Sequence, residues 1–283
     1  MRCLILTDIH GNLPALRAVL ATPQAAGCRR VFSLGDHTGF GPRPRQVHDL
    51  LASLGAVMLL GNHEARLRRM GEAAFAGYGW APARWTAREL AGAADGLPVD
   101  FRLADVLMTH GAPGDPFRLL SEAELPGVLG ALPEGCRLLL SGHHHSPWRV
   151  TAGDRTAVNP GSLGMREDSV GGRAPFAVLT VDEGPARVDV FDVAYDLADV
   201  RRDYIASGCA AIAPEISRAA FLTMAEGRPL YVLRFVTHAR RTAERLGLSP
   251  DDRAAWAEAD RAWPWPEPIP SDVYWARLNH PHD

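Results

Sequence analysis

The stretch MRCLILTDIH at residues 1–10 opens the chain with a short apolar run that ends in Asp8 and His10. The same arrangement recurs in RVFSLGDH (30–37), AVMLLGNH (56–63), DVLMTH (105–110) and CRLLLSGHHH (136–145). Seven of the eleven histidines follow these runs. An apolar run of about four to seven residues closed by Gly or polar residues is typical of a buried strand. The pattern therefore predicts five strands, each followed by side chains that can bind metal.

The ends of these five strands are expected to lie together. In open α/β sheets, ligands bind at the carboxyl ends of the strands, so one sheet would place all the terminal side chains along one edge. On an extended backbone, Asp8 and His10 would project to the same side, and His143 and His145 share that spacing. If the polar side chains that follow the five runs had no shared role, their recurrence would require five independent coincidences. We interpret them as a metal site for more than one ion.

The segments between and after the runs indicate the fold class. Expected helices at 12–20, capped by Asn12, and at 44–54 alternate with the first three strands, which favours parallel strands and right-handed crossovers. Residues 148–193 contain β-like segments separated by Gly, Asp and Pro turns, typical of a second, mostly antiparallel sheet. The expected fold is α/β: a four-layer α-β-β-α sandwich of two mixed sheets with a C-terminal helical extension.

Two further segments are expected to be helical. Residues 64–96 are rich in Ala and Arg, and residues 196–283 carry three or four amphipathic helices and an extended, proline-alternating stretch at 264–270. We place the domain boundary at residue 195, with the site in 1–195. The extension 196–283 should pack on that domain or on a second subunit, so a homo-oligomer through these helices is one expectation.

Composition excludes several classes of protein. The chain has 283 residues, 47% hydrophobic and 22% charged, and its net charge of −3 offers no basic face for nucleic acid. The four cysteines lack CxxC spacing and are typical of buried thiols in a reducing compartment. With no N-terminal signal and no apolar stretch long enough for a bilayer, we expect a cytoplasmic protein without a membrane partner.

The ligand types constrain the metal. Carboxylate, amide oxygen and imidazole without thiolate suit Mn, Fe, Zn, Co or Ni, and we favour Mn or Fe. Seven candidate ligands are too many for one ion and suit two divalent ions, with Asp36 as the natural bridge. Two ions about 3.5–4 Å apart would attract phosphate and acidify a bridging water to hydroxide, which is equipment for hydrolysing phosphate esters. The candidate ligands are Asp8, His10, Asp36, Asn62, His110, His143 and His145.

The ordered motifs DxH (8–10), GD (35–36), GNHE (61–64), HG (110–111) and GHxH (142–145) resemble the calcineurin-like metallophosphoesterase superfamily. The resemblance covers roughly residues 1–195 and is highly specific. It implies that His63 assists the leaving group. The segments GFGP (39–42) and NPGSLG (159–164) resemble a bacterial branch with small phosphodiesterases and diadenosine tetraphosphatase-like proteins. The implied first metal is held by Asp8, His10, Asp36 and His145, and the second by Asp36, Asn62, His110 and His143.

Two departures from relatives bear on the substrate. Protein serine/threonine phosphatases of this superfamily carry a second Asp and an Arg after the Gly-Asp pair, whereas this chain reads GDHTGF at 35–40. Protein dephosphorylation is therefore disfavoured. Many small phosphodiesterases of this type lack the histidine after the Asn, but His63 is present here. Acid assistance for a poor leaving group is therefore available.

Several other residues near these motifs have ordinary structural interpretations. Arg166 follows the NPGSLG turn and is a candidate contact for a substrate phosphate, although loop arginines are more often only solvated. His37 and His144 are expected to be loop residues, and Arg66 to lie on a solvated helix face. Glu64 is expected to hold loop geometry.

We therefore expect a dinuclear phosphoesterase that acts on a phosphomonoester or phosphodiester, with a small, nucleotide-like phosphorylated substrate. A dinucleoside polyphosphate (Ap4A-type) hydrolase is the alternative. A nuclease is less favoured because no basic stripe accompanies the site. A non-catalytic interaction module is least favoured, because a scaffold has no need to keep every ligand.

Overall fold

The computed structural model describes residues 1–229 and 231–265, and its strands form two five-stranded sheets. The first has the order β10-β9-β1-β2-β3, with bounds Arg187–Ala194, Arg173–Thr180, Arg2–Leu6, Arg30–Ser33 and Val57–Met58. The second has the order β4-β5-β6-β8-β7, with bounds Asp100–Leu103, Val106–Thr109, Leu138–Leu140, Arg155–Asn159 and Trp148–Ala152. Both sheets mix parallel and antiparallel pairs, as predicted.

The five apolar runs do not belong to one sheet, so that prediction is wrong. Strands β1, β2 and β3 pair in parallel in the first sheet, whereas β5 and β6 pair in parallel in the second. The inner faces of the two sheets share one core, in which Ile5 and Phe32 pack with Met108 and Leu140. Because the sheets pack face to face, their strand ends still meet on one side of the molecule.

The late strands also distribute differently from the prediction of a separate antiparallel sheet. The β9–β10 hairpin joins the first sheet, where Ala177 of β9 pairs with Ile5 of β1. The β7–β8 hairpin joins the second sheet beside β6. Six of the eight residues of β9 are buried, because β9 lies between β1 and β10 inside the sheet. The alternation of apolar and polar residues identifies a strand, but it does not specify which neighbouring strand pairs with it.

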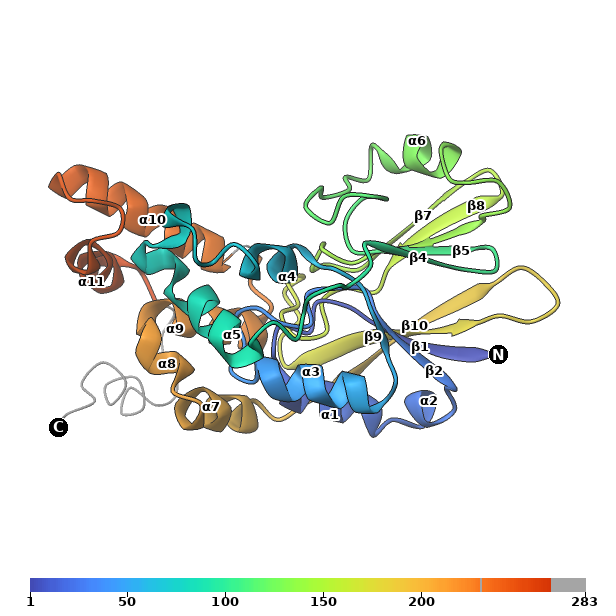
Figure 1. Ribbon diagram of the computed structural model, residues 1–283, viewed down its shortest axis with the longest axis horizontal. Coiled ribbons are helices and arrows are strands. Elements are labelled where there is room, and N and C mark those ends of the chain that lie inside the picture. The colour runs from blue at the N-terminus through green and yellow to red at the C-terminus, as the bar shows by residue number, and fades with distance from the viewer. Residues whose placement is uncertain (230, 266–283) are drawn as a thin grey trace.

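Helices complete the four layers (Figure 1). Helix α1 (Leu13–Leu20), α2 (Pro23–Ala26) and α3 (Pro44–Ser53) cover the outer face of the first sheet, and α6 (Leu125–Gly130) covers the second. As predicted, Asn12 caps α1 by accepting from the Ala15 amide. The α-β-β-α sandwich is therefore confirmed.

The segment predicted as helical at 64–96 is broken into four short pieces. These are α4 (Asn62–Leu67), the 3₁₀ turns η1 (Ala73–Phe75) and η2 (Tyr78–Trp80), and α5 (Ala81–Leu90). Gly71, Gly77 and Gly79 lie in the breaks or turns, and glycine costs about 1 kcal/mol against alanine inside a helix.

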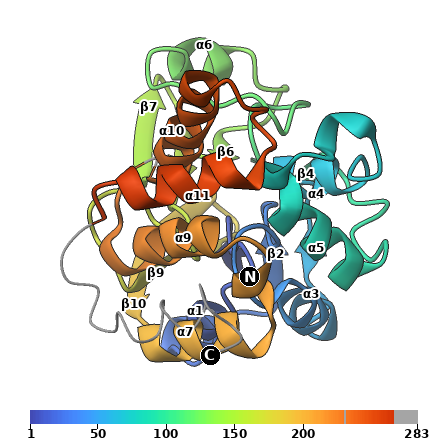
Figure 2. The same cartoon turned by 90° about the vertical axis from the view of Figure 1, so that its left-hand side faces the viewer.

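Five helices follow β10 in the part of the extension that the structure describes, rather than three or four. They are α7 (Leu197–Ala206), α8 (Cys209–Ile212), α9 (Pro214–Glu226), α10 (Tyr231–Leu246) and α11 (Arg253–Ala262). Figure 1 shows α9, α10 and α11 grouped at one end of the molecule, and Figure 2 views them from that end. Their core includes Trp85 of α5 and Met165, so these helices pack against the sheet-bearing part. The predicted extended stretch beyond Trp265 lies outside the described residues.

The carboxyl ends of the first parallel strands point toward these helices. Figure 1 places the amino terminus of β1 on the right and α7–α11 on the left. The strand-end residues therefore lie between the sheets and the helical end. In the described ranges, no helix has both the length and the apolar character needed to cross a membrane.

Candidate metal centre

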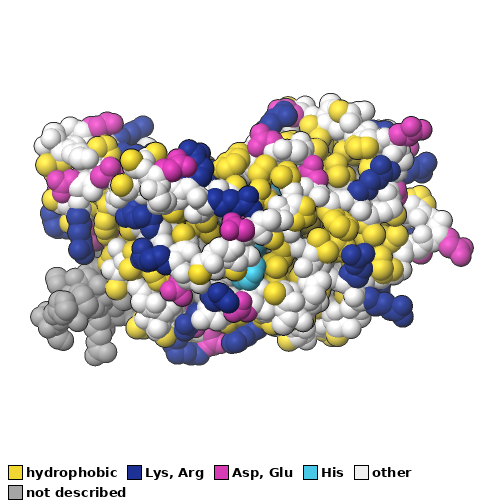
Figure 3. Space-filling model, viewed as in Figure 1, with side chains coloured by type: hydrophobic (Ala, Val, Ile, Leu, Met, Phe, Trp, Pro, Cys, Tyr) yellow, Lys and Arg dark blue, Asp and Glu magenta, His cyan; other side chains and the backbone are white. Residues whose placement is uncertain are grey.

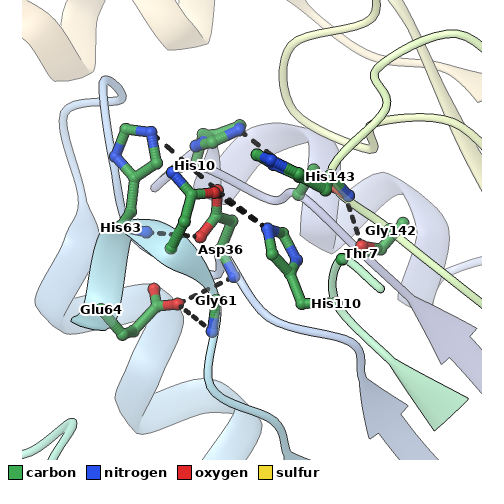
Figure 4. Close-up of polar contacts among 12 residues, drawn as sticks. Thr7, His10, Asp36, Gly61, His63, Glu64, His110, Gly142 and His143 are labelled. Atoms are coloured by element: carbon green, nitrogen blue, oxygen red, sulfur yellow. Dashed lines mark hydrogen bonds and ion pairs between the residues drawn. The ribbon is translucent and has the colours of Figure 1, made fainter. Parts of the chain in front are cut away.

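All seven predicted ligands converge where the strands end. Figure 4 labels four of them, His10, Asp36, His110 and His143. Three groups of side chains have ligand atoms within 4.8 Å of one another. Because Asp36 belongs to two of these groups and shares one with His10, the three groups form one continuous site. The groups are Asp8, His10 and His145; His10, Asp36 and His63; and Asp36, His110 and His143.

The first group fits a cation. Nε2 of His10 and Nε2 of His145 face each other at 3.0 Å, and Oδ1 of Asp8 lies 3.8 and 3.6 Å from them. Oδ1 of Asp8 is buried and has no hydrogen-bond partner among the described residues. A buried carboxylate oxygen without a donor is costly, and a cation between these atoms would satisfy it.

The second group fits a cation for the same reason. As placed, the Asn62 amide oxygen lies 3.0 Å from Nε2 of His110, 3.0 Å from Nδ1 of His143 and 2.9 Å from Oδ2 of Asp36. The Asn62 and Asp36 oxygens repel unless a cation lies between them or the amide turns its NH₂ group toward Asp36. A bound ion would therefore determine which way the Asn62 amide faces.

The electrostatics of the site favour positive charge. Burial lowers the pKa of His110, but Asp36 and Asp8 outweigh it and raise the pKa to about 9. Burial raises the pKa of Asp36, yet His110 and His63 hold it well below its usual range. Burial and the neighbouring His145 hold the pKa of His10 well below the ordinary value. The site thus combines an ionised Asp36 carboxylate with a neutral His10 imidazole, the forms that bind metal. A cation at His110 would take the place of the proton that the carboxylates hold on that ring.

Four of the seven ligands have left-handed backbone conformations. The φ angles are 52° at Asp8, 50° at His10, 49° at Asp36 and 65° at His143. The expected extended backbone at Asp8 and His10 is therefore wrong, although the two side chains do share an ion-sized site. Such conformations cost free energy and cluster at functional sites.

Glu64 holds the loops that carry the ligands, as predicted. Its buried carboxylate accepts hydrogen bonds from the backbone amides of Asp36, Thr38 and Gly61 at 2.8, 2.9 and 3.1 Å. The Thr38 hydroxyl donates to it as well, at 2.6 Å. Figure 4 shows Glu64 beneath Asp36, on the side away from the other ligands.

This role predicts a large loss of stability in Glu64→Gln. The NH₂ group of glutamine would face backbone amides that need an acceptor, and each unsatisfied donor costs about 1–3 kcal/mol. We expect the urea midpoint to fall by an amount equivalent to about 2–6 kcal/mol for two such donors. The control is Glu72→Gln, an exposed partner of Arg69, which should leave the midpoint nearly unchanged. Equal midpoints for both variants would contradict the role.

Other supporting residues were missed by the sequence interpretation. Nδ1 of His145 lies 3.4 Å from a carboxylate oxygen of Glu167, and the Thr7 hydroxyl donates to Asp8 at 2.5 Å. Asn159 donates to the carbonyls of Gly142 and His144. Only Asn159 carried a signal, as the first residue of the NPGSLG motif; Glu167 lies in a loop without any.

His63 lies at the opening of the site. Its Nε2 is 3.9 Å from Oδ2 of Asp36, and its ring centroid is 5.0 Å from those of His10 and Phe40. The side chain keeps 21% exposure, so it can meet a substrate. In contrast, His37 is buried against His48.

Two arginines near the site were considered in the sequence, Arg166 and Arg66, and the prediction for Arg66 is wrong. The Arg166 guanidinium is engaged by Asp168 at 2.6 Å and Asp192 at 3.0 Å, and its role in phosphate binding stays a prediction. Arg66 is not on a solvated face as expected: it contacts the Asn62 amide and lines a pocket beside the site. The short helix α4 starts at Asn62, so Arg66 lies one turn beyond the ligand and points the same way.

The pocket beside the metal centre has a volume of about 400 Å³. His63 and His145 line it on the metal side, and side chains from α5, α9 and α10 line it elsewhere. In Figure 3, histidine reaches the surface between the helical part and the sheets. We call this cavity the α5–α10 pocket.

Comparisons with known proteins agree with this geometry. The uncharacterized protein MJ0912 of Methanocaldococcus jannaschii is 25% identical over 217 residues, covering 68% of this chain and 87% of that one. The crystal structure of a metallophosphoesterase from Sphaerobacter thermophilus has a TM-score of 0.62 and 27% identity, covering 74% of this chain and 95% of that one. Hypothetical protein PH1004 from Pyrococcus horikoshii OT3 shares the fold, with a TM-score of 0.65 and 19% identity over 81% and 99% of the two chains.

The family model for the calcineurin-like phosphoesterase superfamily domain matches residues 1–184. That range includes every strand up to the start of β10 and every candidate ligand. The chain therefore belongs to the calcineurin-like phosphoesterase superfamily of metal-dependent phosphoric ester hydrolases.

Proposed function

We propose that the protein hydrolyses a small phosphate ester with the help of two divalent metal ions. The observation that carries the proposal is the convergence of lone-pair atoms in two groups, Asp8–His10–His145 and Asp36–His110–His143, which a third group containing His10 and Asp36 links. Seven oxygen and nitrogen ligands exceed what one ion needs. The metals we favour are Mn and Fe, with Zn, Co and Ni also suited to these donors.

Each proposed metal position would draw on four side chains. Asp36 would serve both positions, because its carboxylate lies between the His10 side and the His110 side of the site. We assign the first position to Asp8, His10, Asp36 and His145, and the second to Asp36, Asn62, His110 and His143.

When bound, two divalent ions supply the positive charge that stabilises a phosphoryl group in transit and the acidity that produces a nucleophile at neutral pH. The chain's own residues do the rest. Asp8 and Asp36 set the charge of the site, and Glu64 fixes the position of the Asp36 backbone. We assign to His63 the donation of a proton from its imidazolium to the departing alkoxide oxygen, and its partial exposure at the opening supports this role.

The substrate class within this function is a phosphomonoester or phosphodiester. A nucleotide and a dinucleoside polyphosphate are the candidates that the sequence led us to expect. A pocket of about 400 Å³ suits a small molecule rather than a protein surface, which supports the inference against protein dephosphorylation.

Metal removal tests the proposal. The Mn-loaded protein should hydrolyse a nitrophenyl phosphomonoester or phosphodiester, and dialysis against a chelator should abolish turnover because the nucleophile and the charge are lost. Adding Mn back should restore it. A panel of nucleoside monophosphates, cyclic nucleotides and diadenosine tetraphosphate would rank the candidates. Turnover that survives complete metal removal would contradict the proposal, as would a metal-loaded protein inert on every ester.

A further inference from the structure

The α5–α10 pocket opens directly onto the metal centre. His63 and His145 line both, so a molecule held in the pocket can place an attached phosphate between the two metal positions. The helical extension supplies Ile216 of α9 and Val232 and Val236 of α10. The pocket is thus built partly from helices outside residues 1–184, the range matched by the family model.

The walls of the pocket are mainly apolar. Most polar side chains gather on the metal side. Away from it are Arg240 of α10 and the hydroxyl of Thr86, which donates to the Gly39 carbonyl at 3.3 Å. A purine or pyrimidine edge would lose its hydrogen bonds to water against such walls. An aryl or branched alkyl group makes no such hydrogen bonds and would lose none. The main apolar lining residues are Phe40, Leu67, Trp80, Pro82, Ala83 and Met165.

Two arginines in the pocket have no ion-pair partner in the described ranges 1–229 and 231–265. They are Arg66 of α4 and Arg240 of α10. The Arg66 guanidinium lies over the Phe117 ring at 5.2 Å and touches the Asn62 amide. If the Asn62 oxygen faces a bound metal, its NH₂ group faces Arg66 and offers it no acceptor. A phosphoryl oxygen would supply one.

We propose that the substrate is a phosphate ester whose alcohol part is a bulky apolar group, aryl or branched alkyl. The apolar group occupies the α5–α10 pocket, and the phosphate lies between the metal centre and Arg66. This inference rests on the proposed phosphoesterase function and narrows its substrate class. It departs from the nucleotide-like substrate expected from the sequence.

The test compares esters that have similar leaving alkoxides and differ in apolar bulk. Ethyl, 2-phenylethyl and 2-(1-naphthyl)ethyl phosphate, each also as its methyl diester, are assayed with the Mn-loaded full-length protein beside adenosine monophosphate. We expect kcat/KM to rise at least about tenfold from the ethyl to the naphthylethyl ester, since even one methylene in an apolar pocket is worth about 10–200-fold.

Variants that fill the α5–α10 pocket test whether the apolar group of the ester binds there. Ala83→Leu, on the pocket wall, should lower kcat/KM for the naphthylethyl ester by about tenfold and leave the ethyl ester within about twofold. Ala87→Leu, one turn further along α5 and outside the lining, is the matched control. If Ala83→Leu does not fold, Leu233→Ala replaces it, because Leu233 lines the pocket yet is 58% exposed. Leu233→Ala should lower kcat/KM for the naphthylethyl ester and leave kcat/KM for the ethyl ester nearly unchanged.

Arginine variants test where the phosphate lies. Arg66→Gln should raise KM for all the esters alike, by about tenfold for one charge-assisted contact. Arg241→Gln, on the exposed side of α10 outside the pocket lining, should change none of them.

The outcomes are distinguishable. Failure of the metal-loaded protein on every ester removes the proposed function itself. Hydrolysis with equal kcat/KM for ethyl and naphthylethyl esters overturns only the apolar substrate, as does a preference for adenosine monophosphate. An Arg66→Gln protein with unchanged KM overturns the placement of the phosphate.

Discussion

Asp36→Ala should lose both metal ions and at least about 10³-fold in kcat/KM. Asp36 shares ligand groups with His10 on one side and with His110 and His143 on the other, so its removal takes a ligand from both positions. It also removes a buried negative charge that supports the imidazoles. Charge stabilisation by a metal pair is worth several kcal/mol, and each 1.36 kcal/mol is tenfold in rate. Metal analysis after gel filtration and steady-state kinetics measure both effects.

Backbone strain must be separated from ligand loss in this experiment. Asp36 has a φ of 49°, a conformation that alanine adopts less readily than asparagine. Asp36→Asn keeps the shape and the backbone preference but removes the charge, and it should also bind less metal. Asp49→Ala, an exposed aspartate paired with Arg45, is the control and should keep two ions. A full metal complement in folded Asp36→Ala would refute the bridging role.

His63→Gln should keep the metal and the fold but slow the hydrolysis of alkyl esters by about 10²–10⁴-fold, the usual contribution of a general acid. An alkoxide needs a proton as it leaves, whereas nitrophenolate does not. The rate of hydrolysis of the nitrophenyl ester should therefore fall much less. The position of His63, partly exposed beside Asp36 and directly after Asn62, motivates the assignment.

His144→Gln is the matched histidine control. His144 lies between His143 and His145, yet its Nδ1 contacts the Ser146 carbonyl rather than either ligand group. The variant should retain turnover on both kinds of ester. If His63→Gln slows alkyl and nitrophenyl esters equally, His63 positions the substrate and does not donate the proton.

Much of the site could be predicted from the sequence because each of its ligands lies within a short motif that also indicates the local secondary structure. A short apolar run predicts a strand, and the residues that follow it must lie at the strand's end, so Asp8, Asp36 and His110 could each be placed at the end of a strand. They lie together although β5 belongs to the other sheet, because the two sheets pack face to face. Glu64 could be interpreted as a loop anchor because it follows the Asn62 cluster closely. It occupies the third position of α4, where a carboxylate reaches back to backbone amides.

What could not be predicted depends on contacts between distant segments. An apolar run does not state which strand it pairs with, so the division of β1–β3 and β5–β6 between two sheets was missed. Glu167 reaches His145 only because the loop after β8 folds back over the site. Arg66 appeared solvated because the apolar walls that surround it come from α5 and α10, which lie far along the chain.

Crystals of the Mn-loaded protein provide the most direct test of the two-metal site. Anomalous diffraction at the Mn absorption edge should give two peaks about 3.5–4 Å apart. One should be surrounded by Asp8, His10 and His145, the other by Asn62, His110 and His143, with Asp36 between them. A single peak, or peaks away from these side chains, would contradict the account.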